Sequence, residues 1–404
     1  MFVITDRVRI TFFVFQLLQR FEYFHKNPVL TANHDLAKTV AKAIRTEMKS
    51  DFFWSLNFQP QFYADLFYNG LLPIAVRLDG FPTPRHFGRL FPKLPETAKK
   101  SGGLVINMPK LHVQRCVVCD FSWIHVKKSV RKKAKRYNVS FDIAWEEVVK
   151  GLIEQHGQNW LYDPVVETFL LLHRKPLKKC SLKSSGNKKP ISDENGAFIS
   201  VHSVELWEEG KLVAGELGYS VGSVYTSLTG FRSKDCTGSI QMLAMAGMLK
   251  QLGYSMWDLG MALPYKLELG AKNFPRAEFI ALLRTLRDRP PKPHLDEQSV
   301  IKTKFGIMSV QSGKKFNARW AIDLLRDKES NLAGDFKTAT SKGTSKAESS
   351  DSKNRKNSTV KGTPETHTSS SKKSKVRKKK RKKANSNSSL GVKEQDQLET
   401  DEKD

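Results

Sequence analysis

The chain has 404 residues, of which 39% are hydrophobic and 10% aromatic, and this composition excludes a fibrous or wholly disordered protein. With 68 Lys and Arg against 41 Asp and Glu, the formal net charge is +27, for which a polyanionic partner, nucleic acid first, is the simplest explanation. Four cysteines in a chain this long argue against a disulfide scaffold and for a reducing compartment.

The N-terminal segment is apolar but interrupted. The run from Ile10 to Leu18 contains two polar residues and ends at Arg20, so we expect no membrane span from it. No small-residue cleavage site follows, which argues against a signal peptide and favours a helix or strand packed on the core. The first residues are poor in acids, and organelle targeting stays open as an alternative.

The first half of the chain predicts mainly helices. Apolar residues recur at helical spacing in several segments, and one segment opens with proline in its first turn. The expected elements are a helix around 62–70 ending near Gly70, loops or short strands in 78–110, helices at 141–155 and 164–173, and a long exposed loop at 174–196.

The second half predicts a small sheet with helices. Three short β-rich runs at 199–207, 211–220 and 223–229 indicate an antiparallel meander. A helix at 237–252, a strand at 255–258 and a short helix at 265–270 follow. This order is that of an acetyltransferase-like α+β layer, although many α+β folds share it.

Three parts are expected along the chain: a small N-terminal α+β domain at 1–120, an α+β domain at 121–330, and a disordered tail at 331–404. The tail is rich in Ser, Thr and Lys and holds one aromatic residue, so it cannot bury enough surface to fold. Within it, Lys372 to Lys383 contains ten basic residues in twelve. This run is a nuclear or nucleolar targeting signal, an RNA-binding segment, or a solvent-exposed cluster of charged residues without a specific role.

Five segments occur in an order and at a spacing known from one protein family. They are HVKKSVRKK (125–133), NWLYDPVVETFLLLH (159–173), VHSVELW (201–207), LVAGELGYSVG (212–222) and LELGAKNFPRAEF (267–279). Together they resemble the leucyl/phenylalanyl-tRNA–protein transferases, and the loop at 174–196 looks like an insertion. The resemblance implies a GNAT-like domain, without implying that this chain uses acetyl-CoA. It also implies an aminoacyl-tRNA donor, an acceptor protein with a basic N-terminal residue, and a link to protein degradation.

The same resemblance implies a substrate pocket. Its positions for the side chain of the transferred amino acid are Trp160, Phe169, Tyr225 and Met245, although such residues beside a sheet are equally often core. A further pocket position is Glu216, where the family has an apolar residue. That substitution changes which amino acid fits, or closes the pocket to Leu and Phe.

The polar centre departs from the family pattern. In this sequence Leu228 stands at an acidic position and Gly260 at a glutamine position, while Asp258 is kept. Asp258 is a candidate catalytic residue that orients an amine, or else a helix cap or turn residue. We hypothesise that Glu216 supplies the lost carboxylate, because strand alternation over 212–220 places it on one face with Leu212, Ala214 and Gly218.

A basic segment is the candidate tRNA-binding site. Its cations reach phosphates in a salt-dependent way, and the adjacent Tyr137 is a candidate for stacking on a base. The alternative is a solvated basic helix. The tRNA-binding candidates are Lys127, Lys128, Arg131, Lys132, Lys133, Lys135 and Arg136.

No metal and no cofactor is predicted. Cys116 and Cys119 form a single Cys-x-x-Cys motif without a second close pair, and the two valines between them suggest a buried strand. The segment from Lys234 to Ser239 has one glycine, a poor match to a loop that binds the pyrophosphate of acetyl-CoA.

The sequence therefore predicts a cytoplasmic aminoacyltransferase, with nuclear import by Lys372 to Lys383 as an option. Its substrates are aminoacyl-tRNA and the N-terminus of an acceptor protein, and no membrane partner is expected. Two alternatives stay open: a catalytically silent relative that binds tRNA or another RNA, and an enzyme that uses another acyl donor.

Overall fold

The three β-rich runs form the longest strands of the computed structural model, β6 (Ala197–Glu208), β7 (Lys211–Val221) and β8 (Val224–Arg232). β6 pairs antiparallel with β7, and β7 pairs antiparallel with β8. The predicted meander is confirmed. Bulges interrupt the pairing at Leu206/Trp207 and at Leu217/Gly218, so side-chain alternation along β7 is not uniform relative to its neighbours.

The structure describes residues 26–31, 34–79, 103–179, 197–291 and 315–326, all within one unit of the chain, Met1–Phe336. The predicted tail at 331–404, the apolar run at Ile10 to Leu18 and residues 180–196 of the predicted insertion lie outside these residues.

The meander is the centre of a nine-stranded mixed sheet in the described residues, with the order β10-β3-β9-β8-β7-β6-β4-β11, and β5 also paired with β6. The pair β8 and β9 is parallel, and the other pairs are antiparallel. The additional strands are β3 (Gln114–Val118), β4 (Tyr137–Phe141), β5 (Leu177–Lys179), β9 (Met256–Asp258), β10 (Lys272–Pro275) and β11 (Phe316–Asn317). The fold is therefore α+β.

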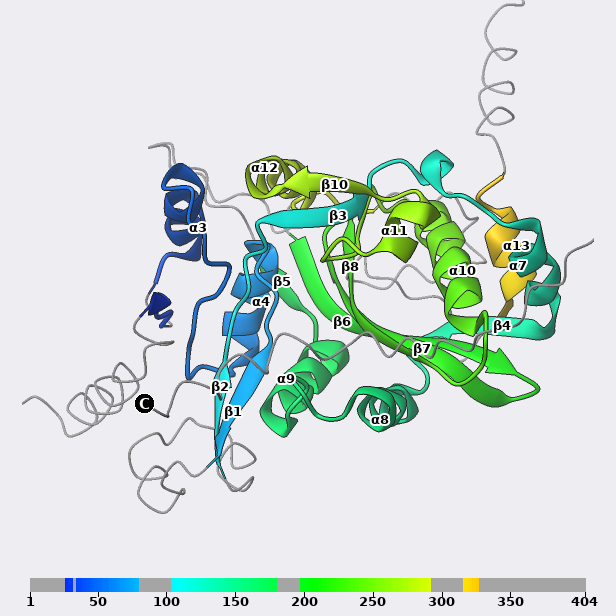
Figure 1. Ribbon diagram of the computed structural model, residues 1–404, viewed down its shortest axis with the longest axis horizontal. Helices are drawn as coiled ribbons and strands as arrows, with labels where there is room; N and C mark the ends of the chain where they lie inside the picture. The colour runs from blue at the N-terminus through cyan, green and yellow to red at the C-terminus, as the bar shows by residue number, and fades with distance from the viewer. Residues whose placement is uncertain (1–25, 32–33, 80–102, 180–196, 292–314, 327–404) are drawn as a thin grey trace, which may run out of the picture. The chain divides into compact units, whose positions relative to one another are not determined.

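Helices cover both faces of this sheet (Figure 1). One core lies between the sheet and α4 (Pro60–Tyr68), α8 (Trp145–His156), α9 (Asp163–Arg174) and α12 (Arg276–Leu286). The other lies under α7 (Lys128–Lys133), α10 (Thr237–Gln251) and α13 (Ala318–Asp323). The remaining elements are α3 (Leu36–Arg45), the hairpin of β1 (Ala75–Asp79) with β2 (Gly103–Asn107), the 3-10 turns η1 (Phe121–Trp123) and η2 (Ala134–Arg136), and α11 (Pro264–Leu269). None of these described helices combines the length and apolarity that a membrane crossing requires.

Two predictions for the described residues are wrong, at one loop and at one helix. The loop expected at 174–196 contains a strand, β5, because Leu177–Lys179 pair with β6 at the edge of the sheet. The helix expected at 141–155 begins only at Trp145, because the preceding residues pair with β6 as β4, with Phe141 opposite Val204. A short apolar run does not distinguish strand from helix, and the sheet decides here. β3 precedes residue 121 yet lies inside the large sheet, so the domain boundary at 120/121 remains a prediction.

Gly247 fixes the distance between α10 and α13. A Cβ atom at this position would lie 1.8 Å from the carbonyl oxygen of Ala321, which no side chain can tolerate. The backbones of the two helices are therefore in direct contact, and α13 seals the end of the core beneath α10.

Candidate active site

Glu216 is a buried carboxyl group in the middle of β7, with 5% of its surface exposed. Its Oε1 accepts hydrogen bonds from the Tyr225 hydroxyl at 3.1 Å and the Ser227 hydroxyl at 2.9 Å. The indole Nε1 of Trp257 donates to Ser227 Oγ at 2.9 Å. Because indole can only donate, the Ser227 hydroxyl must direct its own hydrogen to Glu216.

Burial raises the pKa of Glu216 from 4.5 to about 7, although the hydrogen bonds from Ser227 and Tyr225 and the positive charge of Lys266 act in the opposite direction. In the part of the chain that the structure describes, no group donates to its second oxygen, Oε2. A carboxyl group with a pKa near neutrality and one unoccupied oxygen is suited to accepting a proton at physiological pH.

Asp258, at the end of β9, is fully buried and has both oxygens occupied. Oδ1 accepts from Arg115 Nε at 3.1 Å and from the Gly260 amide at 2.9 Å, while Oδ2 accepts from Arg115 Nη2 and from the Thr226 hydroxyl at 3.1 Å. Such a saturated carboxylate has no free oxygen for an incoming amine. Its arrangement suits a positioning residue.

Arg115 is the partner that sequence reasoning did not find. It lies in β3 with 1% of its surface exposed, its Nη1 lies 3.4 Å from the carbonyl oxygen of Gly70, and its guanidinium lies 4.5 Å from the ring centre of Phe279. It therefore joins α4, the sheet and α12. One feature of the sequence points to this pair: Arg115 directly precedes the apolar residues Cys116 to Val118. An arginine beside a buried run implies an acidic partner in the core.

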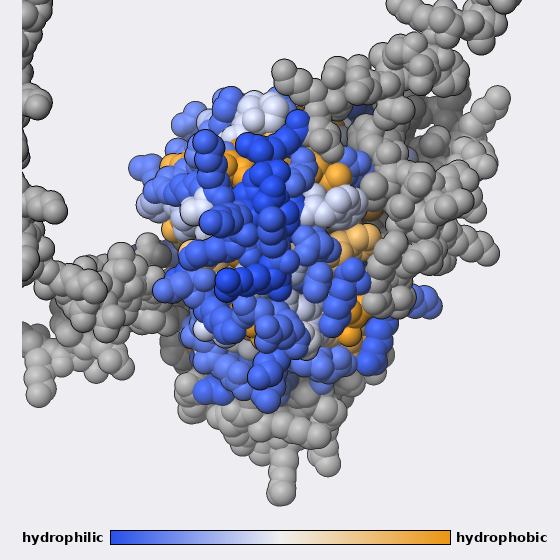
Figure 2. All heavy atoms as spheres, turned by 90° about the vertical axis from the view of Figure 1, so that its right-hand side faces the viewer, coloured by the Kyte–Doolittle hydropathy of each residue, from blue (hydrophilic) through white to orange (hydrophobic). Residues whose placement is uncertain are grey.

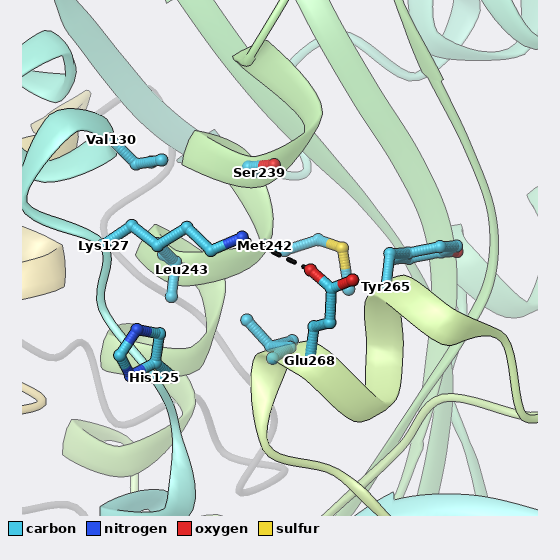
Figure 3. Close-up of a pocket in the computed structure, with 9 residues that line it drawn as sticks. His125, Lys127, Val130, Ser239, Met242, Leu243, Tyr265 and Glu268 are labelled. Atoms are coloured by element: carbon cyan, nitrogen blue, oxygen red, sulfur yellow. Dashed lines mark hydrogen bonds and ion pairs between the residues drawn. The ribbon is translucent and has the colours of Figure 1, made fainter. Parts of the chain in front are cut away.

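A pocket of about 90 Å³ opens between the start of α7, α10 and α11 (Figure 3). Its walls are largely apolar, with Met242 and Leu243 from α10, and Lys127 Nζ lies 3.3 Å from Glu268 Oε2 across its mouth. Both charged side chains are more than half exposed, so this ion pair is weak and readily exchanged. The pocket is lined by His125, Lys127, Val130, Ser239, Met242, Leu243, Tyr265, Glu268 and Leu269.

Tyr265 lines this pocket, and its neighbour Lys266 donates from Nζ to the carbonyl oxygens of Leu259 and Met261. The negative charge of Glu216 raises the pKa of both residues. Burial lowers the pKa of Lys266, partly offset by Asp258, Cys116 and Glu216.

The seven predicted tRNA-binding cations lie together on α7 and η2, but three of them are engaged. Arg131 Nη2 donates to Asp323 of α13 at 2.8 Å, Lys127 pairs with Glu268, and Lys133 Nζ lies 3.5 Å from the sulfur of Cys236. The other four form no ion pair with a described residue: Lys128, Lys132, Lys135 and Arg136. Tyr137, the expected stacking residue, is 8% exposed, so its ring is not open to a base.

Part of this chain is similar to a known protein family. The protein family described as Leucyl/phenylalanyl-tRNA protein transferase matches residues 193–284. Curated relatives with this name come from Stutzerimonas stutzeri, 26% identical over 41% of this chain and 66% of the relative, and from Aromatoleum aromaticum, 26% identical over 42% and 64%. Over these residues the chain is similar to the leucyl/phenylalanyl-tRNA protein transferase family. It spans slightly less than two thirds of the length of these relatives.

The part shared with the transferase family contains the site. Glu216, Asp258 and Glu268 lie within residues 193–284, whereas Arg115 and α13 lie outside them. The comparison also gives a solved structure of the C-terminal domain of a lysylphosphatidylglycerol synthetase from Agrobacterium fabrum, an assignment that its title marks as provisional. The match covers 62% of this chain and 75% of the other chain, with 14% sequence identity and a TM-score of 0.26. A TM-score this low does not establish a shared fold.

Two residues that depart from the transferase family's pattern have structural roles. Leu228 is partly buried and packs on the core of the α8 and α9 face. Gly260 has a φ of +71°, which favours glycine, and its amide caps Asp258. A glutamine at this position would be strained in the present backbone conformation.

The four residues that the transferase resemblance assigns to a substrate pocket do not line one cavity. Trp160 and Phe169 pack against each other on the α8 and α9 face, with ring centres 6.3 Å apart. Tyr225 and Met245 are fully buried in the core on the other face. Of the four, Tyr225 reaches the polar centre, through its bond to Glu216.

The Cys-x-x-Cys motif lies at the end of β3. Cys116 is buried and Cys119 partly exposed, and both are free thiols. In the ranges that the structure describes, no three His, Cys, Asp or Glu side chains come together in a way that would hold a metal ion.

A second polar cluster lies between β4, β6 and β7. His202 Nδ1 is 2.9 Å from Asp142 Oδ2, and His202 Nε2 is 2.9 Å from Ser220 Oγ. The order of groups is that of a nucleophilic triad, but Ser220 is 3% exposed and also pairs with the Tyr254 hydroxyl. We assign this cluster to the support of the sheet.

Proposed function

We propose that this chain transfers an amino acid from an aminoacyl-tRNA to the N-terminal amine of an acceptor protein, with Glu216 as the general base. The observation that carries the proposal is the buried Glu216, with its near-neutral pKa and its unoccupied Oε2, inside the region shared with the transferases. The relatives' name describes such a transfer for them. Leu or Phe is the proposed donor amino acid by the same likeness.

The proposed chemistry balances without a cofactor. The neutral form of the N-terminal amine, whose ammonium form has an ordinary pKa near 8, forms a bond from its nitrogen to the ester carbonyl carbon and loses one proton to Glu216 Oε2. The ester C–O bond then breaks, and the departing ribose oxygen of the tRNA takes that proton from Glu216 and becomes a hydroxyl group. The fixed donors Tyr225 and Ser227 keep the carboxyl group in place during both steps.

Asp258 and Arg115 act as positioning residues in this proposal. Their buried pair fixes β9 against β3, and the backbone that follows β9 leads into α11, which carries Tyr265, Lys266 and Glu268. We propose a GNAT-like fold because a helix and a parallel strand, β9, follow the antiparallel meander, which is the expected order of elements. Of the four pocket residues expected from the resemblance, this proposal keeps Tyr225, which donates to Glu216. Trp160 and Phe169 lie in the core on the other face of the sheet from Tyr225 and Met245, so the four do not form the walls of one pocket.

The pocket of Figure 3 is the proposed site for the basic first residue of the acceptor. Apolar walls suit the methylene groups of a Lys or Arg side chain, and Glu268 suits its charge. Lys127 now occupies the position of that charge, so the acceptor must displace an exposed and weak ion pair.

We expect Glu268→Lys to raise KM for an acceptor with N-terminal Arg by about tenfold or more, with a smaller change in kcat, because a cation replaces the carboxylate. The measurement is the transfer rate against acceptor concentration. Glu154→Lys makes the same charge change on an exposed residue of α8 and should leave KM unchanged. Equal effects of both variants would remove the acceptor role from Glu268.

The decisive experiment incubates the purified protein with tRNAs charged with labelled Leu, Phe or Met, plus a protein with N-terminal Arg or Lys, at low salt. Label in the protein acceptor supports the proposal and names the donor. Salt-sensitive tRNA binding without transfer of any donor supports the second candidate function instead, a catalytically silent RNA-binding relative. Leu228 and Gly260 favour that candidate, since the corresponding polar side chains are absent.

The link to protein degradation and the cytoplasmic or nuclear location stay predictions.

A further inference from the structure

Trp320 is an exposed aromatic side chain on the basic face of the protein. It lies on α13, outside the residues shared with the transferase family, and 40% of its surface is exposed. Within 127–139 and 315–326 it is the only large hydrophobic side chain of the described residues that is exposed. The others on the described surface lie on other elements: Val113, Leu171, Met261, Tyr265 and Leu267.

Two polar contacts fix α13 beside the cations of α7 and η2. Asp323 accepts from Arg131 of α7 at 2.8 Å and from Arg319 of its own helix at 2.8 Å. Asn317, which caps the helix, donates to the carbonyl oxygen of Lys135 at 3.1 Å and accepts from the amide of Trp320 at 3.3 Å. Trp320 is therefore one helical turn from a residue bonded to the backbone of η2.

The indole ring of Trp320 is backed on one side. The ring of Phe316, which is 8% exposed, stacks against it with centres 5.5 Å apart and planes 19° apart. Its Nε1 donates to no group among the residues the structure describes. A flat ring that is supported from below and exposed over two fifths of its surface offers a stacking platform.

Positive charge surrounds this platform. Residues 127–136 contain seven basic and no acidic residues, and residues 315–326 contain three basic residues and one acid, Asp323, which is already paired with two arginines. Figure 2 shows this side of the molecule, where α7 and α13 lie, as a largely hydrophilic face. The face therefore attracts polyanions.

We propose that Trp320 stacks on an unpaired base of a bound RNA while the cations of α7, η2 and α13 contact the neighbouring phosphates. Stacking on aromatic side chains beside a basic groove is how proteins bind single-stranded RNA. An anionic membrane would also attract the cations, but a surface that inserts into lipid needs several apolar side chains, and this face has one. The inference deepens the tRNA-binding part of the proposed function, and it does not require that transfer occurs.

The test measures the affinity of the full-length chain for a labelled single-stranded oligouridine and for an RNA duplex over a range of salt concentrations. We expect Trp320→Ala to weaken oligouridine binding about 5- to 100-fold without changing the slope of log K against log salt, because stacking releases no counterion. Lys132→Gln should instead lower that slope by roughly 0.7 to 1. Leu171→Ala, which changes a still more exposed apolar residue on α9, is the control and should change neither quantity.

Trp320→Phe keeps an aromatic ring and should retain most of the affinity, which separates loss of stacking from loss of the helix. Three results would overturn the proposal: wild-type affinity of Trp320→Ala, an equal loss on the duplex, whose bases are already stacked, or binding to anionic phospholipid vesicles that depends on Trp320 in the same way. Because the oligouridine carries no amino acid, a failed transfer assay does not affect this experiment, and a failed stacking test does not affect the transfer assay.

Discussion

Arg115→Met is expected to lower the free energy of unfolding by about 3–5 kcal/mol, because it leaves the fully buried carboxylate of Asp258 without its counter-charge. Methionine fills much of the space, so the cost comes mainly from the unpaired charge. The interaction with the Phe279 ring and the contact with Gly70 are lost as well. Chemical denaturation of wild type and variant at one pH measures the difference.

A double-mutant cycle completes this test. Asp258→Leu combined with Arg115→Met removes both charges, and the double variant should be more stable than either single variant. Arg115→Lys keeps the charge but loses the two-point contact, and should fall between wild type and Arg115→Met. Additive effects of the two single changes would show that the pair is not the source of the stability.

Glu216→Gln is expected to reduce the rate of transfer by about 10²- to 10⁴-fold, the usual contribution of a general base. The amide still accepts from Tyr225 and Ser227, so the local structure should survive. Single-turnover transfer from labelled aminoacyl-tRNA measures the effect. In the wild-type enzyme kcat/KM should rise with pH through two apparent pKa values, about 7 for Glu216 and near 8 for the acceptor amine, and Glu216→Gln should lose the lower one. Unchanged transfer by Glu216→Gln would remove Glu216 from the mechanism.

The same variant should stabilise the protein at pH 8. The Glu216 carboxyl has a pKa of 4.5 in the unfolded chain and about 7 in the folded one, so the folded state binds more protons between these values. Stability therefore decreases as pH rises from 4.5 to 7 and is level above 7, and the gain from Gln at pH 8 is at most about 3 kcal/mol. Glu205→Gln is the matched control, a buried carboxyl on β6 whose pKa burial also raises. It should affect stability without removing transfer.

Part of the order of elements was accessible to sequence reasoning, where an element has a strong local pattern. The meander, the proline that opens α9 and the small-residue helix α10 all follow from periodicity and turn chemistry. The start of α8 did not follow, since pairing with β6 takes the preceding residues into β4. Local spacing does not report such tertiary pairing.

The candidate site was accessible only in part. Strand alternation and the family pattern pointed to Glu216 and Asp258, but the roles of the two carboxyl groups depend on partners far away in the chain. Asp258 is saturated by Arg115, which lies 143 positions earlier, and no short-range pattern links the two. Trp320 was missed for the same reason, since its place beside η2 is decided by contacts of α13 and not by its own sequence surroundings.

The contact at Gly247 has a consequence for evolution. Since a Cβ at this position would overlap the carbonyl oxygen of Ala321, a protein with any larger residue there cannot seat a helix where α13 lies. A relative with a larger residue at the position of Gly247 can carry a helix like α13 only at a greater distance from α10. Such a displacement would also move the aromatic platform of Trp320 relative to α7 and η2.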